Sequence, residues 1–148
     1  MQLITRNFGL IEIDDNDIID FPEGIPGFES VKKFTILGKV EEETPFHWLQ
    51  GVDNTDVVFV VIDPRLIKPD YVADVDFSEV EVLGIEDSEK VLMYSIVVVP
   101  DDLKKMSANL KAPIIINVDN NKGKQVVMDK GDYPIKYYFM EEIQRIGG

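Results

Sequence analysis

Residues 57–64 read Val-Val-Phe-Val-Val-Ile-Asp-Pro, a run of β-branched and aromatic residues that ends in a turn signal. Such side chains favour strands, and proline cannot continue a central strand because it lacks the backbone N–H. The apolar residues are consecutive and do not alternate with polar ones, which predicts a strand buried on both faces. Residues 91–99 have the same character and end at Pro100. Together these two runs predict the centre of a β-rich fold.

Shorter candidate strands lie on both sides of these runs, with turn residues between them. Each is an apolar or β-branched stretch bounded by Gly, Pro, Asn or Asp. The predicted strands cover residues 3–4, 9–13, 33–38, 46–50, 113–118 and 125–128. The sequence Asp-Asn-Asn-Lys-Gly at 119–123 predicts a hairpin loop between the last two.

Helix signals are few and short. Ser78 is a candidate N-cap, with a glutamate three residues later and Gly84 as a candidate stop. Either Asp101 or Asp102 is a candidate cap for a second short helix at 103–106. These signals predict helices of only one or two turns.

The chain shows no internal repeat, no low-complexity tract and no linker, which predicts a single domain over residues 1–148. The C-terminal residues 136–146 fit either a strand or a frayed helix. We predict a mainly β, small single-domain β-barrel-like fold of short antiparallel strands with one to three short helices. Side chains would fill the interior of such a barrel and leave no room for a large ligand.

Residues 21–29 read Phe-Pro-Glu-Gly-Ile-Pro-Gly-Phe-Glu and form the second informative stretch, here called the signature turn. Proline fixes φ, and glycine permits positive φ, so this spacing cannot continue a helix or a central strand. Phe21, Ile25 and Phe28 are nevertheless apolar. The stretch therefore predicts a shaped turn that holds bulky side chains in place.

The chain is strongly acidic, with 15 basic and 28 acidic residues and a net charge of −13. Residues 1–100 hold 7 basic and 21 acidic residues, whereas residues 101–148 hold 8 basic and 7 acidic ones. Such a charge repels the phosphates of nucleic acids and of anionic membranes, so neither is an expected direct partner. A basic protein partner fits the charge, and solubility alone is the simpler explanation.

The acidic charge is concentrated in residues 69–89, which contain eight acids and no Lys or Arg. Apolar residues are interleaved with the acids. Acids beside exposed apolar groups predict a docking surface for a basic, partly apolar partner. The alternative is an ordinary excursion whose apolar face packs on the barrel.

Little in the chain supports catalysis. There is one histidine and no cysteine, so a typical zinc site, a disulfide and a thiolate nucleophile are not expected. His47 is interpreted as a hydrogen-bonded structural side chain, and Trp48 as a packing residue or an interface anchor. The adjacent carboxylates are interpreted as solvated surface, and neither 14–17 nor 119–121 has the spacing of an EF-hand. We therefore predict no enzyme, no metal and no cofactor.

The N-terminal sequence has no basic region followed by a long apolar run, and the longest apolar stretches are far too short for a membrane helix. With no cysteine either, a cytoplasmic protein is expected.

The signature turn and several later stretches resemble the FliW family, small bacterial regulators of flagellar assembly. Their order and spacing agree over nearly the whole chain. The stretches are residues 21–29, Pro45-Phe46-His47-Trp48-Leu49-Gln50, Asp53-Asn54, Val57 to Pro64, Ala112 to Asn117, Lys124 to Val127 and Asp132-Tyr133-Pro134-Ile135.

The resemblance implies a β-barrel-like fold and a non-enzymatic role. FliW-like proteins bind CsrA, a dimeric RNA-binding repressor of flagellin mRNA, and they also bind flagellin, which competes for them. The expected function is therefore relief of translational repression by binding CsrA away from its main RNA-contacting surface. The expected partners are CsrA and flagellin, and the free protein is expected to be a monomer. The alternatives are a flagellin-specific export chaperone and, in another class, a carboxylate-dependent hydrolase.

The predicted partner contacts come from two regions. Those from the signature turn follow the resemblance, and those from the acidic segment follow from charge. The predicted residues are Phe21, Glu23, Ile25, Phe28, Asp70, Asp74, Asp76, Glu79 and Glu81. Phe21 and Phe28 are equally consistent with plugs for the core.

Overall fold

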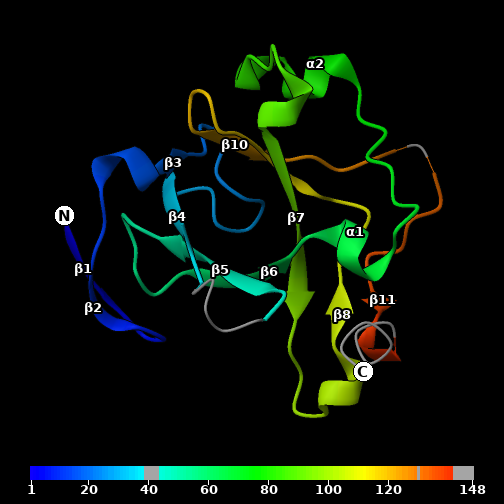
Figure 1. The fold of residues 1–148 in the computed structure, drawn as a ribbon, viewed down its shortest axis with the longest axis horizontal. Coiled ribbons are helices and arrows are strands. Elements are labelled where there is room, and N and C mark those ends of the chain that lie inside the picture. Colours follow the sequence, from blue (N-terminus) through cyan, green and yellow to red (C-terminus); the bar gives the residue numbers. More distant parts are fainter. Residues whose placement is uncertain (39–43, 130, 142–148) are drawn as a thin grey trace.

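A closed β-barrel forms the body of the computed structural model, which describes residues 1–38, 44–129 and 131–141 (Figure 1). Neighbouring strands are antiparallel except for β3 and β10, which pair in parallel, and the pairing of β7 with β9 closes the barrel. This architecture confirms the predicted mainly β, barrel-like fold. The barrel strands in the described residues are β3 (Ile19–Asp20), β4 (Lys33–Leu37), β5 (Phe46–Gly51), β6 (Val58–Ile62), β7 (Val91–Val98), β9 (Ile114–Asn117) and β10 (Lys122–Gln125).

The valine-rich strand β6 is buried on both faces at its C-terminal end, as its sequence predicts, whereas Val58, Phe59 and Val60 are half-buried. Val61 belongs to the cluster that fills the barrel, and the neighbouring Ile62 belongs to a second cluster on the outside. Strand β7 is similar at its centre, but Leu92 and Val98 are exposed near its ends. Apolar side chains fill the barrel interior: Ile19, Phe21, Ile25, Val31, Phe34, Leu49, Val61, Ile114 and Ile116.

The second cluster lies outside the barrel, under α1 (Pro64–Ile67) and the C-terminal segment. Strand β8 (Ser107–Ala108) pairs with β7, and β11 (Tyr137–Tyr138) pairs with β8. The Tyr71 hydroxyl donates to the Leu110 carbonyl oxygen at 2.7 Å, which ties the chain after α1 to this cluster. Helix α1 was not predicted, although Asp63 caps it by accepting from the Arg65 N–H and Pro64 begins it.

The N-terminal strands β1 (Gln2–Thr5) and β2 (Gly9–Glu12) form a separate hairpin and agree with the predicted strands. Leu3, Ile13 and Val52 form the small core beneath it. The 3-10 turn η1 (Asp15–Asp17) leads from this hairpin into the barrel.

The predicted hairpin near residue 120 is displaced in the structure. Strand β10 covers Lys122–Gln125, whereas the sequence predicted a strand at 125–128 after a loop that included Gly123. Asn121 adopts a positive φ of 54°, which tightens the turn so that Lys122 already pairs with Asn117. The glycine that suggested a loop therefore lies inside a strand.

The predicted helices are present with shifted bounds. Helix α2 (Phe77–Val80) begins after Asp76, so its N-cap position lies two residues before the predicted Ser78. The turn η3 (Glu81–Leu83) ends at Gly84, whose φ of 60° confirms the predicted stop. The turn η5 (Leu103–Lys105) is capped by Asp102, and η4 (Ser88–Lys90) was not predicted.

The C-terminal segment contains strand β11 and then helical residues from Met140. Residues 142–146 of the predicted segment lie outside the described residues. Within the described part of the chain, no helix has both the length and the apolar character that crossing a membrane requires.

Candidate functional site

The signature turn contributes side chains to the core of the barrel. Phe21 is fully buried, and its ring packs edge-on against Phe34 with the centroids 5.0 Å apart. Gly123 on β10 makes room for this ring, since a Cβ at Gly123 would lie 2.6 Å from Phe21 Cζ. This contact explains why a glycine occupies a barrel strand, where it otherwise weakens the structure.

The glycines of the turn have different roles. Gly24 has a φ of +66°, and its N–H donates to the Phe21 carbonyl oxygen at 2.9 Å. A Cβ at Gly24 would lie 2.6 Å from Glu29 Cα, so any side chain would strike backbone. The Gly27 N–H donates to Glu29 Oε1 at 3.0 Å, and this hydrogen bond lowers the pKa of the Glu29 carboxyl group.

The turn divides its predicted contact residues between interior and surface. Phe21 and Ile25 lie in the barrel core, exposed by 0% and 2%. For Phe21 this is the core-plug alternative, and Ile25, which was predicted only as a partner contact, is buried as well. They are buried because they pack into the apolar cluster that fills the barrel, from which water is excluded. Glu23 is exposed, and Phe28 is 42% exposed with its ring edge-on to Phe59 at 5.1 Å. Of the four predicted contact residues in the turn, only Glu23 and Phe28 therefore present side chains to a partner.

Lys124 on β10 joins the signature turn to the acidic segment. Its Nζ lies 3.1 Å from Glu23 Oε2 and 3.3 Å from Glu79 Oε2, while its side chain is only 16% exposed. Burial by itself lowers the pKa of Lys124. The two carboxylates together raise this pKa by more than burial lowers it, so the net change is upward. Two regions far apart in the sequence thus meet at one ammonium group, and no local pattern marked Lys124 for this role.

The acidic segment is anchored to the barrel by polar and apolar contacts. Leu83 is fully buried against Ile115 and Val126. The Leu83 carbonyl oxygen accepts from Asn117 Nδ2 at 2.9 Å and from Asn120 Nδ2 at 2.8 Å. This attachment holds α2 and η3 against β9 and β10, at the top of Figure 1.

The outward side of α2 and η3 combines acids with exposed apolar side chains. Phe77 is 75% exposed and Val82 is 42% exposed. Acidic residues precede and follow Phe77 in the sequence. Three of them, Asp74, Asp76 and Glu79, line one hollow together with Asp129. We call this surface the acidic face; it consists of Asp74, Asp76, Phe77, Glu79, Glu81 and Val82.

Asp70, the remaining predicted contact residue within residues 69–89, has a different environment. It lies beside α1 and its Oδ1 is 3.1 Å from Lys68 Nζ, which lowers the pKa of Asp70 and raises that of Lys68. Asp70 therefore has its charge balanced locally, whereas Asp74 and Glu81 form no salt bridge among the described residues.

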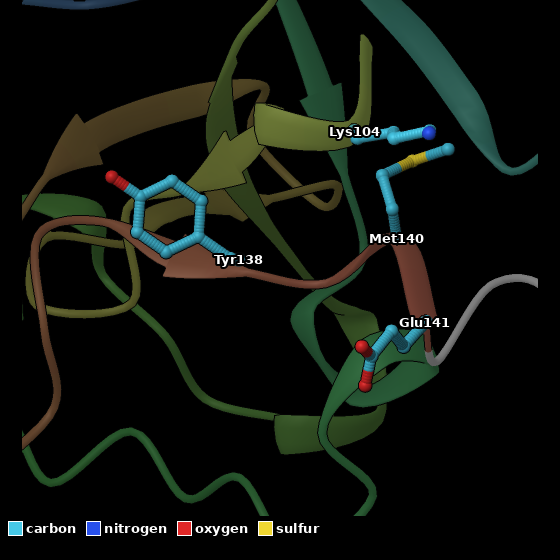
Figure 2. Close-up of a pocket in the computed structure, with 4 residues that line it drawn as sticks. All are labelled: Lys104, Tyr138, Met140 and Glu141. Carbon is cyan, nitrogen blue, oxygen red and sulfur yellow. The ribbon is translucent and has the colours of Figure 1, made fainter. Parts of the chain in front are cut away.

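No arrangement in the described residues resembles a catalytic centre. The hollow in Figure 2, with a volume of about 470 Å³, is lined by Lys104, Tyr138, Met140 and Glu141. In that view Lys104 lies beside Met140, while Tyr138 points away from both. It contains neither a nucleophile–base pair nor paired carboxylates, and the described residues contain no group of three His, Cys, Asp or Glu that could hold a metal ion.

His47 is a packing residue on β5. Its ring lies 5.9 Å from that of Tyr94, and burial lowers its pKa. Its Nδ1 has no hydrogen-bond partner among the described residues, which differs from the expected hydrogen-bonded histidine. Among the described residues no hydrogen bond joins His47 to a nucleophile, so no catalytic pair is recognisable.

Comparisons with known proteins agree with this geometry. A family model described as "FliW protein" matches residues 2–139. The chain belongs to the FliW family. It is 53% identical to the flagellar assembly factor FliW of Thermoanaerobacter pseudethanolicus over 144 residues, which cover 97% of this chain and 96% of that protein. It is also 35% identical to the FliW of Treponema denticola, with 99% of each chain covered.

A solved structure supports the same assignment. The crystal structure described as that of the flagellar assembly factor FliW superposes on this FliW-family chain with a TM-score of 0.87 at 39% identity. The match covers 94% of this chain and 96% of the other. The chain therefore shares the fold of that flagellar assembly factor.

Proposed function

We propose that this FliW-family protein acts in flagellar assembly by binding the translational repressor CsrA and relieving repression of flagellin mRNA, with flagellin as a competing partner. The acidic face is the observation that carries the proposal. It places Phe77, 75% exposed, among acids in a segment without Lys or Arg. A solvent-exposed aromatic ring in an acidic segment is suited to a partner with a basic rim and an apolar centre.

The net charge of −13 gives the antagonism a physical basis. When the protein is bound to an RNA-binding partner, it adds negative potential near the path of the RNA and repels phosphates. Binding free energies are coupled reciprocally, so RNA weakens binding of this protein as much as this protein weakens binding of RNA. High salt screens this repulsion, so we expect the antagonism to fade as ionic strength rises.

The alternative of a flagellin export chaperone has weaker support. Of the apolar residues that would mask flagellin, Phe21 and Ile25 are buried, which leaves Phe28 and the half-buried Trp48. The hydrolase alternative needs a carboxyl group with a raised pKa, whereas Glu29 and Asp70 have lowered ones. A non-enzymatic binding role is therefore our proposal.

The test is size-exclusion chromatography with light scattering on a mixture with CsrA from the same organism, repeated with flagellin leader RNA. We expect a stable complex that excludes the RNA. Asp74→Lys and Glu81→Lys should each weaken the complex roughly tenfold, because a repulsive charge replaces an attractive one in the interface. Asp101→Lys makes the same change at an exposed position outside the acidic face and should have wild-type affinity.

Separate elution of the wild-type protein and CsrA at low and moderate salt would reject the proposal. Equal losses from Asp101→Lys and Glu81→Lys would show that net charge, and not the acidic face, governs binding.

A further inference from the structure

Lys124 places a positive charge between Glu23 of the signature turn and Glu79 of the acidic face. Residues 69–89 contain no Lys or Arg, so strand β10 supplies this base from a later part of the sequence. For a basic partner, charge alone makes the lysine unfavourable, because like charges repel. Electrostatic attraction of such a partner therefore does not account for Lys124.

The ammonium group of Lys124 is occupied by its two carboxylates. Its Nζ lies 3.1 Å from Glu23 Oε2 and 3.3 Å from Glu79 Oε2, and its side chain is only 16% exposed. The side chains of Glu23 and Glu79, in contrast, are 61% and 51% exposed. A partner that approaches this surface thus meets the two carboxylates, while the lysine beneath them is largely covered.

Lys124 also supplies the main restraint on the two glutamate side chains. Among the described residues, Glu23 and Glu79 each form an ion pair with Lys124 and with no other side chain. Glu79 lies on α2, which has no buried residue and is at the periphery of the molecule in Figure 1. Lys124 lies on β10, which is paired with β3 and β9 in the barrel wall. The lysine therefore ties two surface carboxylates to a barrel strand.

A side chain that is already held in one orientation loses less conformational entropy when a partner binds it. We propose that Lys124 is a positioning residue, which holds Glu23 and Glu79 in the orientation in which a basic partner contacts them. This inference rests on the proposed function and deepens it. It extends the docking surface from the acidic face to Glu23, and it gives Lys124 an effect on affinity opposite to that of its charge.

Lys124→Met distinguishes positioning from charge, because the two accounts predict changes of opposite sign. Removing one of the 15 basic residues changes the net charge from −13 to −14, which by itself would strengthen binding of CsrA. We expect instead that the Kd rises roughly fivefold, because the two released glutamates then have to be ordered on binding. Isothermal titration calorimetry at low and moderate salt measures the Kd.

Two further variants are matched controls. Lys122→Met makes the same change of charge two positions earlier on β10, and Lys122 forms no salt bridge among the described residues, so this variant should not weaken binding. Lys124→Arg keeps the charge and the donors, and its Kd should be within about twofold of the wild-type value. Circular dichroism melting curves check that all variants are folded.

A double-mutant comparison separates positioning from a general loss of structure. Glu79→Gln should weaken binding in the wild-type background. In the Lys124→Met background it should weaken binding less, because Glu79 is no longer held there. A loss of structure unrelated to the glutamate would make the two effects of Glu79→Gln equal.

Four results would overturn the inference: unchanged or tighter binding by Lys124→Met, equal losses from Lys124→Met and Lys122→Met, a loss from Lys124→Arg as large as that from Lys124→Met, or equal effects of Glu79→Gln in the two backgrounds. Each of these leaves the complex of the wild-type protein with CsrA intact and so rejects the inference alone. Failure of the wild-type protein to bind CsrA would reject the proposed function and this inference with it.

Discussion

The signature turn and the acidic face meet at Lys124, yet the turn buries two of its apolar side chains whereas the acidic face exposes its phenylalanine. The turn places Phe21 and Ile25 in the barrel, exposed by 0% and 2%. The acidic face leaves Phe77 75% exposed. A sequence pattern that marks a family can thus reflect the folding of the chain, while the surface that we propose for a partner lies in a less distinctive stretch. Substitutions in the two regions should therefore separate stability from binding.

Phe21→Ala tests the folding side of this comparison with the largest expected effect. Removing a fully buried ring from the barrel leaves a cavity beside Gly123 and should lower the free energy of unfolding by about 3–5 kcal/mol. Urea unfolding followed by circular dichroism measures it. Phe77→Ala on the acidic face is the control and should change stability by less than about 0.5 kcal/mol. Similar losses of stability from both variants would contradict the distinction between a folding role for the turn and a surface role for the acidic face.

Gly24→Ala should have the next largest effect. The new Cβ would meet the Glu29 backbone at a position with φ of +66°, so we expect a loss of about 1–3 kcal/mol. Gly27→Ala is a matched control, because Gly27 also has a positive φ, of 89°, but nothing lies within 4 Å of its Cβ position. It should cost less in the same unfolding measurement. An equal cost would mean that φ alone, without the steric contact, limits the turn.

Lys124→Met examines the link between the two regions. The variant removes both ion pairs and leaves Glu23 and Glu79 facing one another, so stability should fall by no more than about 1 kcal/mol at low salt. The loss should shrink as salt screens the two carboxylates. Adding Glu23→Gln to the variant should restore part of it. A salt-independent loss would instead assign the effect to packing of the Lys124 stem.

The smallest expected effect is the pH dependence of the stability that the Glu29 carboxylate contributes to the turn. The hydrogen bond from the Gly27 N–H lowers the pKa of Glu29 below 4.5. As the pH falls, Glu29 is therefore protonated in the unfolded chain before it is protonated in the folded protein. The stabilisation is present above pH 4.5 and is lost as the pH falls through the lower pKa of the folded protein. Glu29→Gln should flatten the acid limb of a plot of melting temperature against pH, and an unchanged acid limb would contradict this role.

Local sequence was sufficient for many elements of the fold. Consecutive apolar residues identified β6 and the centre of β7, because strand propensity and burial act on neighbouring positions. The stop at Gly84 and the Asp102 cap were predicted for the same reason, since a cap contacts residues within one turn. The acids of the acidic face could be located as well, because charge composition needs no structure.

The tertiary structure alone decided where those residues point and what they meet. Phe21 became a core residue because Gly123, about a hundred positions later, leaves space for its ring. Lys124 bridges Glu23 and Glu79, and the parallel pairing of β3 with β10 helps to complete the barrel. The exposure of Phe77 likewise depends on packing. Sequence thus determines local conformation and charge, because these arise from neighbours along the chain, whereas burial and exposure arise from long-range contacts that only the folded chain contains.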